Sequence, residues 1–196
     1  MTARLSPGDW ESPEVRYILP WAATGMTYLA GHFSSLGGIG RTNLARISPN
    51  GVVDKHFQPQ ILYPVVGAGL FTWGDLALLL EDGSVSVIRP SGLVRSRAML
   101  QGGMPGGLRA VWLAPDFTFV LGSFPTGASP FLLQRFSLLG VLVGSCKVAV
   151  KPDQLRVIMQ PDGSLIMSGS FPETGAADWS GIRRLNFKTL ETISAH

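Results

Sequence analysis

The residues of this chain that could perform catalysis or bind a metal are few and widely separated. The histidines are His32, His56 and His196, and the single cysteine is Cys146. A zinc site needs His and Cys ligands at close, regular spacing, and these residues have no such spacing. Cys146 lies in an apolar stretch without the sharp turn that presents a catalytic nucleophile. We therefore expect Cys146 to be a small core residue, without an internal disulfide partner.

Two further patterns resemble binding or catalytic sites only in composition. Residues 37–40 are rich in glycine, but the helix that a dinucleotide-binding loop requires is not predicted to follow them. The neighbouring carboxylates of Glu81 and Asp82, and those of Glu11 and Glu14, fall in a turn or in the N-terminal leader, where solvated side chains are usual. The sequence thus predicts no catalytic, cofactor-binding or metal-ligating residue, and a protein that is not an enzyme.

Tryptophans offer a different kind of chemistry, because their large rings can anchor a partner. Trp21 and Trp112 precede turns within apolar segments, and we expect them in the core. Trp10, Trp73 and Trp179 are candidates for an interface, since a loop Trp commonly anchors a protein or a sugar ring. Trp179 is expected in the loop after an apolar strand. The alternative is that these rings are only partly packed loop aromatics.

A repeat of short strands must position these side chains. Three apolar strands end in Gly-x-Phe, and an arginine follows each Phe by 11 or 13 residues in a second apolar segment. The glycine is expected where a side chain would collide with a neighbouring backbone or where a bulge bends the strand. The Phe should fill space between repeats, and the Arg should bind carbonyls or a turn carboxylate such as Asp54 or Asp162. These structural positions are Gly31, Phe33, Arg46, Gly122, Phe124, Arg135, Gly169, Phe171 and Arg184.

The repeat length predicts an all-β, β-propeller-like fold with about four repeats of short antiparallel strands. Phe124 and Phe171 are 47 residues apart, and Phe33 and Phe124 are 91 apart, about two periods. A period in the forties built from short strands is typical of a propeller blade. The second repeat is degraded, because Leu80 stands at the place of the terminal glycine. We expect a leader at 1–14 and a single domain with repeats at about 15–60, 61–104, 105–151 and 152–196.

Turn residues divide the repeats into strands. The Pro-Asp-Gly sequence at 161–163 predicts a tight turn, in which the Pro presets φ and the Gly takes a positive φ. The similar sequence at 115–117 has Phe117 in place of Gly, and a different turn is expected there. In the fourth repeat we expect four strands, at 155–159, 165–169, 182–185 and 190–193.

Composition and charge limit the classes of partner. Hydrophobic residues make up 45% and charged residues 15% of the chain, against about 25% charged residues in an average protein. Such a chain is expected to hide surface in an assembly. The net charge of +3 is too small to predict nucleic-acid binding. The longest apolar run, at 76–80, is far shorter than the ~20 residues of a membrane helix, and no secretory signal is apparent. We expect folding in a reducing cytoplasm.

One repeat resembles a known family in detail. Residues 26–57 carry an apolar strand, Gly31-x-Phe33, a loop, the strand segment Ala45-Arg46-Ile47, a glycine and then Asp54-x-x-Phe57. This order is similar to the delta-60 repeat, a β-propeller-like family of uncharacterised proteins. Residues 155–187 match the turn, the Gly-x-Phe and the Arg strand, without the closing Asp-x-x-Phe. The resemblance implies a fold and no catalytic residues, and similar proteins occur in bacterial surface proteins and phage structural proteins.

The expected function is that of a non-enzymatic structural or interaction module, most simply a bacteriophage virion protein of the tail or capsid. Its expected partners are other proteins of a larger assembly, including its own copies, bound through residues 61–104 with the run 76–80, the leader and Trp179. The alternative is that the second repeat has only drifted in sequence and keeps a buried strand at 76–80. One alternative is a carbohydrate- or receptor-binding propeller that contacts surface glycans. A third reading is a hydrolase that uses the central channel of a propeller. Bacterial cytoplasm and cell surface are the alternative locations to the virion.

Overall fold

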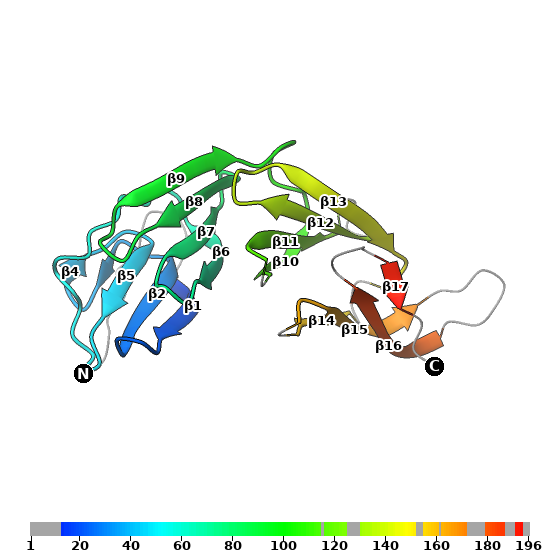
Figure 1. Cartoon of the computed structure of the whole chain (residues 1–196), viewed down its shortest axis with the longest axis horizontal. Coiled ribbons are helices and arrows are strands. Elements are labelled where there is room, and N and C mark those ends of the chain that lie inside the picture. The colour runs from blue at the N-terminus through cyan, green and yellow to red at the C-terminus, as the bar shows by residue number, and fades with distance from the viewer. Residues whose placement is uncertain are drawn as a thin grey trace. The chain divides into compact units, whose positions relative to one another are not determined.

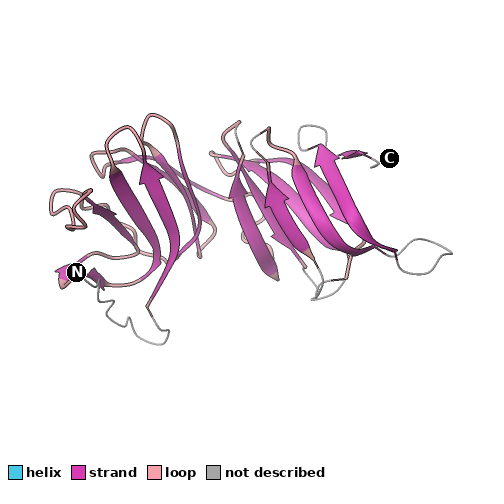
Figure 2. Cartoon of the chain, turned by 90° about the horizontal axis from the view of Figure 1, so that it is seen from below, coloured by secondary structure: helices cyan, strands magenta, loops and turns pink. Residues whose placement is uncertain are grey.

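The computed structural model describes residues 13–114, 116–124, 130–151, 155–160, 162–171, 179–186 and 191–193. Every regular element in these ranges is a β-strand (Figure 2). The strands form four antiparallel sheets, each from one consecutive stretch of chain (Figure 1). This is the all-β, propeller-like architecture of four short-strand repeats that the sequence predicts. Among the described residues, no helix has the length and hydrophobicity needed to cross a bilayer.

The strands follow one another in each sheet as a meander. The first sheet contains β1 (Glu14–Trp21), β2 (Met26–His32) and β5 (Leu44–Ile47), with a small hairpin of β3 (Ser35–Leu36) and β4 (Ile39–Gly40) between the last two. The second contains β6 (Val65–Leu70), β7 (Leu76–Leu80), β8 (Ser84–Ile88) and β9 (Val94–Met99). The third contains β10 (Leu108–Leu113), β11 (Thr118–Ser123), β12 (Phe131–Ser137) and β13 (Leu142–Val148). The fourth contains β14 (Arg156–Met159), β15 (Leu165–Phe171), β16 (Trp179–Asn186) and β17 (Glu191–Ile193).

Contacts divide the chain into two compact units. The first unit comprises Met1–Gly103 with Leu138–Gly140 and contains the first two sheets. The second comprises Met104–Ser137 and Val141–His196 and contains the third and fourth sheets. Most of the expected leader, including Trp10, lies outside the described residues. The expected repeat boundaries stay predictions.

The core of the first unit lies between its two sheets. Leu76, Leu78 and Leu80 of β7 pack with Tyr28 and other side chains of the first sheet in one buried cluster. All five residues of β7 are at most 1% exposed, so both faces of this strand are covered. A continuous apolar run is the pattern of a strand that is buried on both faces. The expectation that this run belongs to a partner surface is therefore wrong.

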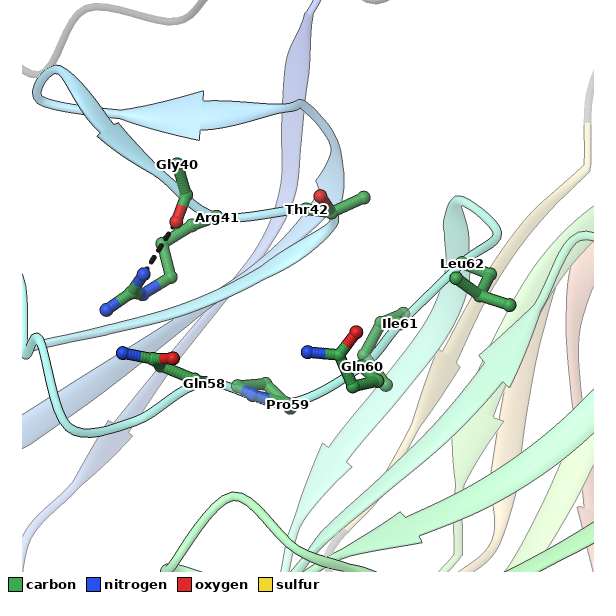
Figure 3. A pocket seen from close by; sticks show the side chains of 8 residues that line it. All are labelled: Gly40, Arg41, Thr42, Gln58, Pro59, Gln60, Ile61 and Leu62. Atoms are coloured by element: carbon green, nitrogen blue, oxygen red, sulfur yellow. Dashed lines mark hydrogen bonds between the residues drawn. The ribbon is translucent and has the colours of Figure 1, made fainter.

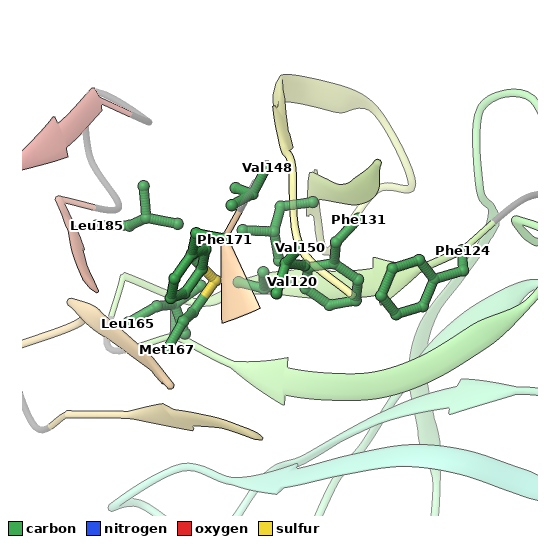
Figure 4. Close-up of a cluster of buried hydrophobic side chains, with 11 residues drawn as sticks. Val120, Phe124, Phe131, Val148, Val150, Leu165, Met167, Phe171 and Leu185 are labelled. Atoms are coloured by element: carbon green, nitrogen blue, oxygen red, sulfur yellow. The ribbon is translucent and has the colours of Figure 1, made fainter. Parts of the chain in front are cut away.

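The core of the second unit is built in the same way from the third and fourth sheets (Figure 4). Phe171 and Met167 from β15 pack in one cluster with Phe131 of β12 and Val150, which follows β13. Phe124 adds a second ring, whose centroid lies 4.9 Å from that of Phe131. The Phe that ends each strand of the Gly-x-Phe type thus fills the interior. Phe33, Phe124 and Phe171 are all at most 1% exposed.

The turns that open the second strand of each sheet share a residue with a positive φ. Gly25, Gly74 and Gly163 have φ values of +70°, +97° and +83°. Phe117 adopts the same left-handed conformation, with φ +63°, and its N–H donates to the Ala114 carbonyl at 2.9 Å. The expectation of a different turn at 115–117 is wrong, because the conformation is kept although a side chain makes it strained.

The fourth sheet has the four strands that the sequence predicts, but all four have changed boundaries, and β16 changes most. β16 begins at Trp179, which pairs with Phe171 of β15. The expectation that Trp179 lies in a loop is wrong, because the pairing of β15 and β16 continues from Leu165 as far as Phe171. The side chain of Trp179 lies outside the described part of the structure.

Candidate functional site

The arginine of the fourth sheet binds the turn between β14 and β15. Arg184 of β16 donates from Nη2 to Asp162 Oδ2 at 2.5 Å and from Nε to Ser164 Oγ at 3.1 Å. Ser164 donates from its N–H and its hydroxyl to Asp162 Oδ1 at 2.9 and 2.7 Å. These bonds from Ser164, with the nearby guanidinium of Arg184, hold the pKa of Asp162 below its ordinary value. We call this three-residue arrangement the Asp–Ser/Thr–Arg brace.

The third sheet repeats the brace. Arg135 of β12 donates from Nε to Thr118 Oγ1 at 3.0 Å, and its Nη2 forms an ion pair with Asp116. Thr118 donates its hydroxyl to Asp116 Oδ1 at 2.7 Å. Arg135 pairs with Val120, which follows Thr118 by two residues. Arg184 pairs with Ile166, which follows Ser164 by two residues. The two braces therefore have the same register.

The second sheet also has the brace, but here it joins the second turn to the fourth strand instead of the first turn to the third strand. Asp82 and Ser84 lie at the turn between β7 and β8, and Arg97 of β9 binds Asp82 Oδ2 at 3.2 Å and Ser84 Oγ at 3.3 Å. A second ion pair in this sheet joins Arg95 to Asp75 at 2.8 Å. Neither pair was predictable from the sequence. The other arginines were located by their spacing after Gly-x-Phe, and the second repeat lacks that motif.

Arg46 of β5 has a different set of partners, and it joins the first sheet to the second. Its Nη2 and Nε donate to Asp54 Oδ2 at 2.6 and 3.0 Å, and its Nη1 donates to the Pro90 carbonyl at 2.5 Å. The guanidinium lies over the rings of Phe57 and Tyr28, 4.6 and 5.8 Å from their centroids. Arg46 and Asp54 are both largely buried, with side chains 14% and 15% exposed.

The Asp54 carboxylate is kept ionised in this setting. Burial alone would raise the pKa of Asp54, but the hydrogen bond from Arg46 and the backbone N–H groups of His56 and Phe57 outweigh that effect. The pKa therefore lies below its ordinary value. The two turn carboxylates that the sequence suggests as partners of the repeated arginines, Asp54 and Asp162, bind Arg46 and Arg184.

The glycines of the repeat differ in what surrounds them. At Gly31 a side chain would collide with the Glu14 carbonyl and lie 2.8 Å from Arg16 N, where β1 bulges against β2. At Gly122 a side chain would instead meet the ring of Phe131. Gly169 pairs with another glycine, Gly181 of β16.

One candidate interface tryptophan can be described in full. Trp73 is 51% exposed and stacks flat on Phe71, with centroids 4.8 Å apart and planes 3° from parallel. Trp10 and the side chain of Trp179 lie outside the described residues. The two tryptophans expected in the core, Trp21 and Trp112, are half-buried and pack against the two core clusters.

A pocket of about 160 Å³ opens in the first unit between two segments outside its large sheets (Figure 3). One wall is residues 40–42 after the small hairpin, and the other is residues 58–62 before β6. Along 58–62 the side chains alternate, so Pro59 and Ile61 are buried while Gln58, Gln60 and Leu62 are exposed. The pocket is thus lined by amides and by one guanidinium above an apolar floor.

Two buried or half-buried side chains hold the walls of the pocket in place. Asn43, with φ +61°, donates from Nδ2 to the Ile61 carbonyl at 3.2 Å and accepts the Phe33 N–H at 3.2 Å. Arg41 donates from Nη2 to the carbonyls of Asp54 and Lys55, each at 3.0 Å. The bond from Asn43 to Ile61 crosses 18 residues of sequence and joins the two walls, and the bonds of Arg41 join the first wall to the Asp54 turn.

The sequence analysis did not find this pocket. Residues 58–62 have no periodic pattern that predicts a strand or a helix, and Asn43 and Arg41 act through contacts distant in sequence. The one available signal was the Asp-x-x-Phe at 54–57, which ends where the pocket wall begins. Within the described ranges, no three His, Cys, Asp or Glu side chains gather as a metal site would require.

The side chain of Cys146 is half-buried on β13, and burial raises the pKa of its thiol. A thiol with a raised pKa is a poor nucleophile at neutral pH. Cys146 also packs against the core of the second unit. The geometry agrees with the small core residue that the sequence predicts.

A comparison with family models supports the fold. Residues 22–57 match the family model described as "Domain of unknown function (DUF5122) beta-propeller", a range that includes β2, β5 and the Asp54 turn. No curated protein matches the chain at a significant level. The chain is similar to a solved structure, BamB from Moraxella catarrhalis, with 12% sequence identity and a TM-score of 0.45. That match covers 98% of this chain and 65% of BamB, and at this TM-score it carries no argument about function.

Proposed function

We propose that this chain is a non-enzymatic structural module that binds other proteins, as a component of a bacteriophage virion associated with the tail or capsid. The observation that carries the proposal is the apolar surface of β13, the outer strand of the third sheet. Val141, Leu142 and Val143 are 49%, 37% and 52% exposed. Soluble proteins usually protect an edge strand with charged side chains, but the first charge here is Lys147. Such an edge suits pairing with a strand of a neighbouring protein.

The outer strand of the second sheet, β9, also has exposed apolar side chains, although it carries two arginines, Arg95 and Arg97. Val94 and Met99 of β9 are 48% and 57% exposed, and Leu93 just before it is 65% exposed. A stable contact through such strands would bury more than about 1,000 Å² in total. We therefore propose a virion as the location, because in a permanent assembly a neighbouring protein covers an apolar edge strand.

The state of the carboxylates also supports a structural role. Asp54, Asp82 and Asp162 each bind an arginine, and each has a pKa below its ordinary value. A general acid needs a carboxyl group whose pKa is raised toward neutrality. These aspartates are instead suited to fixing turns.

Particles purified from the native host test the proposal. We expect the chain to co-sediment with intact particles and to stay bound in high salt. The variant Val143→Lys should remain folded but stay in the particle-free supernatant, because a lysine on β13 opposes docking of an apolar partner. Ile158→Lys is the matched control, since Ile158 of β14 is 60% exposed and outside the proposed edge. Recovery of the natural chain only in the particle-free fraction would contradict the proposal.

A carbohydrate- or receptor-binding role is the second candidate, and Trp73 is the observation that favours it. An exposed ring held flat by Phe71 is suited to stacking on a sugar ring. Binding to an array of surface glycans, and its loss in Trp73→Ala with unchanged thermal unfolding, would support this role. Equal glycan binding by Trp73→Ala and the natural chain would show that Trp73 does not contact the sugar.

A further inference from the structure

We propose that the pocket between residues 40–42 and 58–62 binds a small ligand through a carboxylate group. The proposal does not depend on assembly through β13. It rests on the charge of Arg41, on hydrogen-bonding groups in the pocket that have no partner in the described protein, and on the size of the pocket.

Arg41 differs from the other hydrogen-bonded arginines of the first unit. In the described residues, those arginines each bind a carboxylate: Arg16 binds Glu14, Arg46 binds Asp54, Arg95 binds Asp75 and Arg97 binds Asp82. Arg41 binds three backbone carbonyls instead, those of Gly40, Asp54 and Lys55. Carbonyls satisfy N–H donors but leave the positive charge without a counterion. The pocket wall therefore keeps a net positive charge.

The donors of Arg41 are not all used. A guanidinium has five N–H groups, and three hydrogen bonds to the protein are made. The Nε atom is buried without a hydrogen-bond partner. Nη2 uses both of its donors on the Asp54 and Lys55 carbonyls, so the second N–H of Nη1 is the donor left for a ligand in the pocket.

Neighbouring groups can bind the second oxygen of a carboxylate. The Thr42 hydroxyl and the Gln60 amide line the pocket, and both residues are exposed. Gln58 uses one N–H for the Lys55 carbonyl, at 2.7 Å, and retains a second. Among the described residues, no acidic side chain lines the pocket, so none of this lining repels an anion by its charge.

The volume sets the size of the ligand. A pocket of about 160 Å³ holds roughly five water molecules at about 30 Å³ each. A carboxylate with a few attached atoms fits this space, and the rest of a larger ligand would extend past Leu62. Such a group occurs in acidic sugars and in acidic amino-acid side chains, so the two sources share one recognition chemistry.

Calorimetric titration of the full chain tests the proposal with four probes. Glucuronate and the α-amide of N-acetylglutamate each carry one carboxylate, and glucose and the α-amide of N-acetylglutamine are their neutral counterparts. We expect at least one acid to bind at millimolar concentration or below, more tightly than its neutral counterpart and more weakly as salt is raised. Tighter binding of glucuronate identifies an acidic sugar, and tighter binding of the N-acetylglutamate α-amide identifies an acidic peptide.

Two variants test whether this pocket is the site. Gln60→Glu adds a negative charge at an exposed pocket residue and should weaken binding at least about tenfold without changing thermal unfolding. Asn50→Asp makes the same amide-to-acid change in an exposed turn outside the pocket and should leave binding unchanged. Failure of both acids to bind below about 10 mM, equal binding of the neutral probes, or full binding by Gln60→Glu would overturn the proposal.

Discussion

At the scale of single residues, Gly31 sets how closely two strands approach. A Cβ at this position would collide with the Glu14 carbonyl, and backbone cannot move aside as a flexible side chain can. We expect Gly31→Ala to lower the free energy of unfolding by about 2 kcal/mol or more. At Gly40 a Cβ would meet nothing within 4 Å, so Gly40→Ala should change stability by less than about 0.5 kcal/mol. Urea unfolding measures both, and equal effects would contradict the close-approach argument.

Phe117 illustrates a strained residue that the chain tolerates. Its φ of +63° is the conformation that glycine adopts in the equivalent turns at Gly74 and Gly163. We expect Phe117→Gly to be more stable than Phe117→Ala by about 1 kcal/mol, since only Gly relieves the left-handed strain. The comparison of these two variants removes the contribution of the ring. A more stable Ala variant in thermal or urea unfolding would show that this turn is not strained.

At the scale of the elements, the Asp54 turn links stability to pH. The pKa of Asp54 in the folded chain lies below its ordinary value of 3.8, so its ionised form stabilises the fold. This stabilisation is fully present above pH 4 to 5 and is lost as the pH falls through the folded pKa. We expect Asp54→Asn to lower the free energy of unfolding by about 2 kcal/mol at pH 7. The difference from the natural chain should shrink below pH 3.

Urea unfolding across this pH range measures the effect of the Asp54 substitution. Asp162→Asn serves as the control. It should lower the free energy of unfolding less than Asp54→Asn does, because the Asp162 side chain is 55% exposed and screened by solvent. If the free energies of unfolding of Asp54→Asn and the natural chain differ by a constant amount from pH 7 to pH 2, ionisation of Asp54 does not stabilise the fold.

The elements also show what sequence can and cannot predict. The strands around Gly31, Gly122 and Gly169 and the turn at Gly163 were predictable, because each depends on local residue types and a repeated spacing. The brace of Arg97 was not, since the second repeat has lost the landmark that locates it. The pocket depends on Asn43 reaching Ile61 across 18 residues, and no local pattern encodes such a bond.

At the scale of the whole chain, each of the two units encloses its own apolar cluster. We expect Phe171→Ala to lower the stability of the second unit by about 3–5 kcal/mol while leaving the first unit nearly unchanged. Phe57→Ala should have the reverse effect, because Phe57 is fully buried in the first cluster. Amide hydrogen exchange of β2 and β15 reads the two units separately. Equal loss of protection in both strands for either variant would show a single cooperative unit.

The position of the brace bears on how the chain arose. In the third and fourth sheets it joins the first turn to the third strand, and in the second sheet it joins the second turn to the fourth strand. The brace thus needs three consecutive strands and no fixed place within a sheet. Three consecutive strands are enough for a brace, so a duplication whose ends fall one strand out of frame would still yield a braced sheet. Repeats of this kind can drift in phase along a gene without losing the contact that holds their turns.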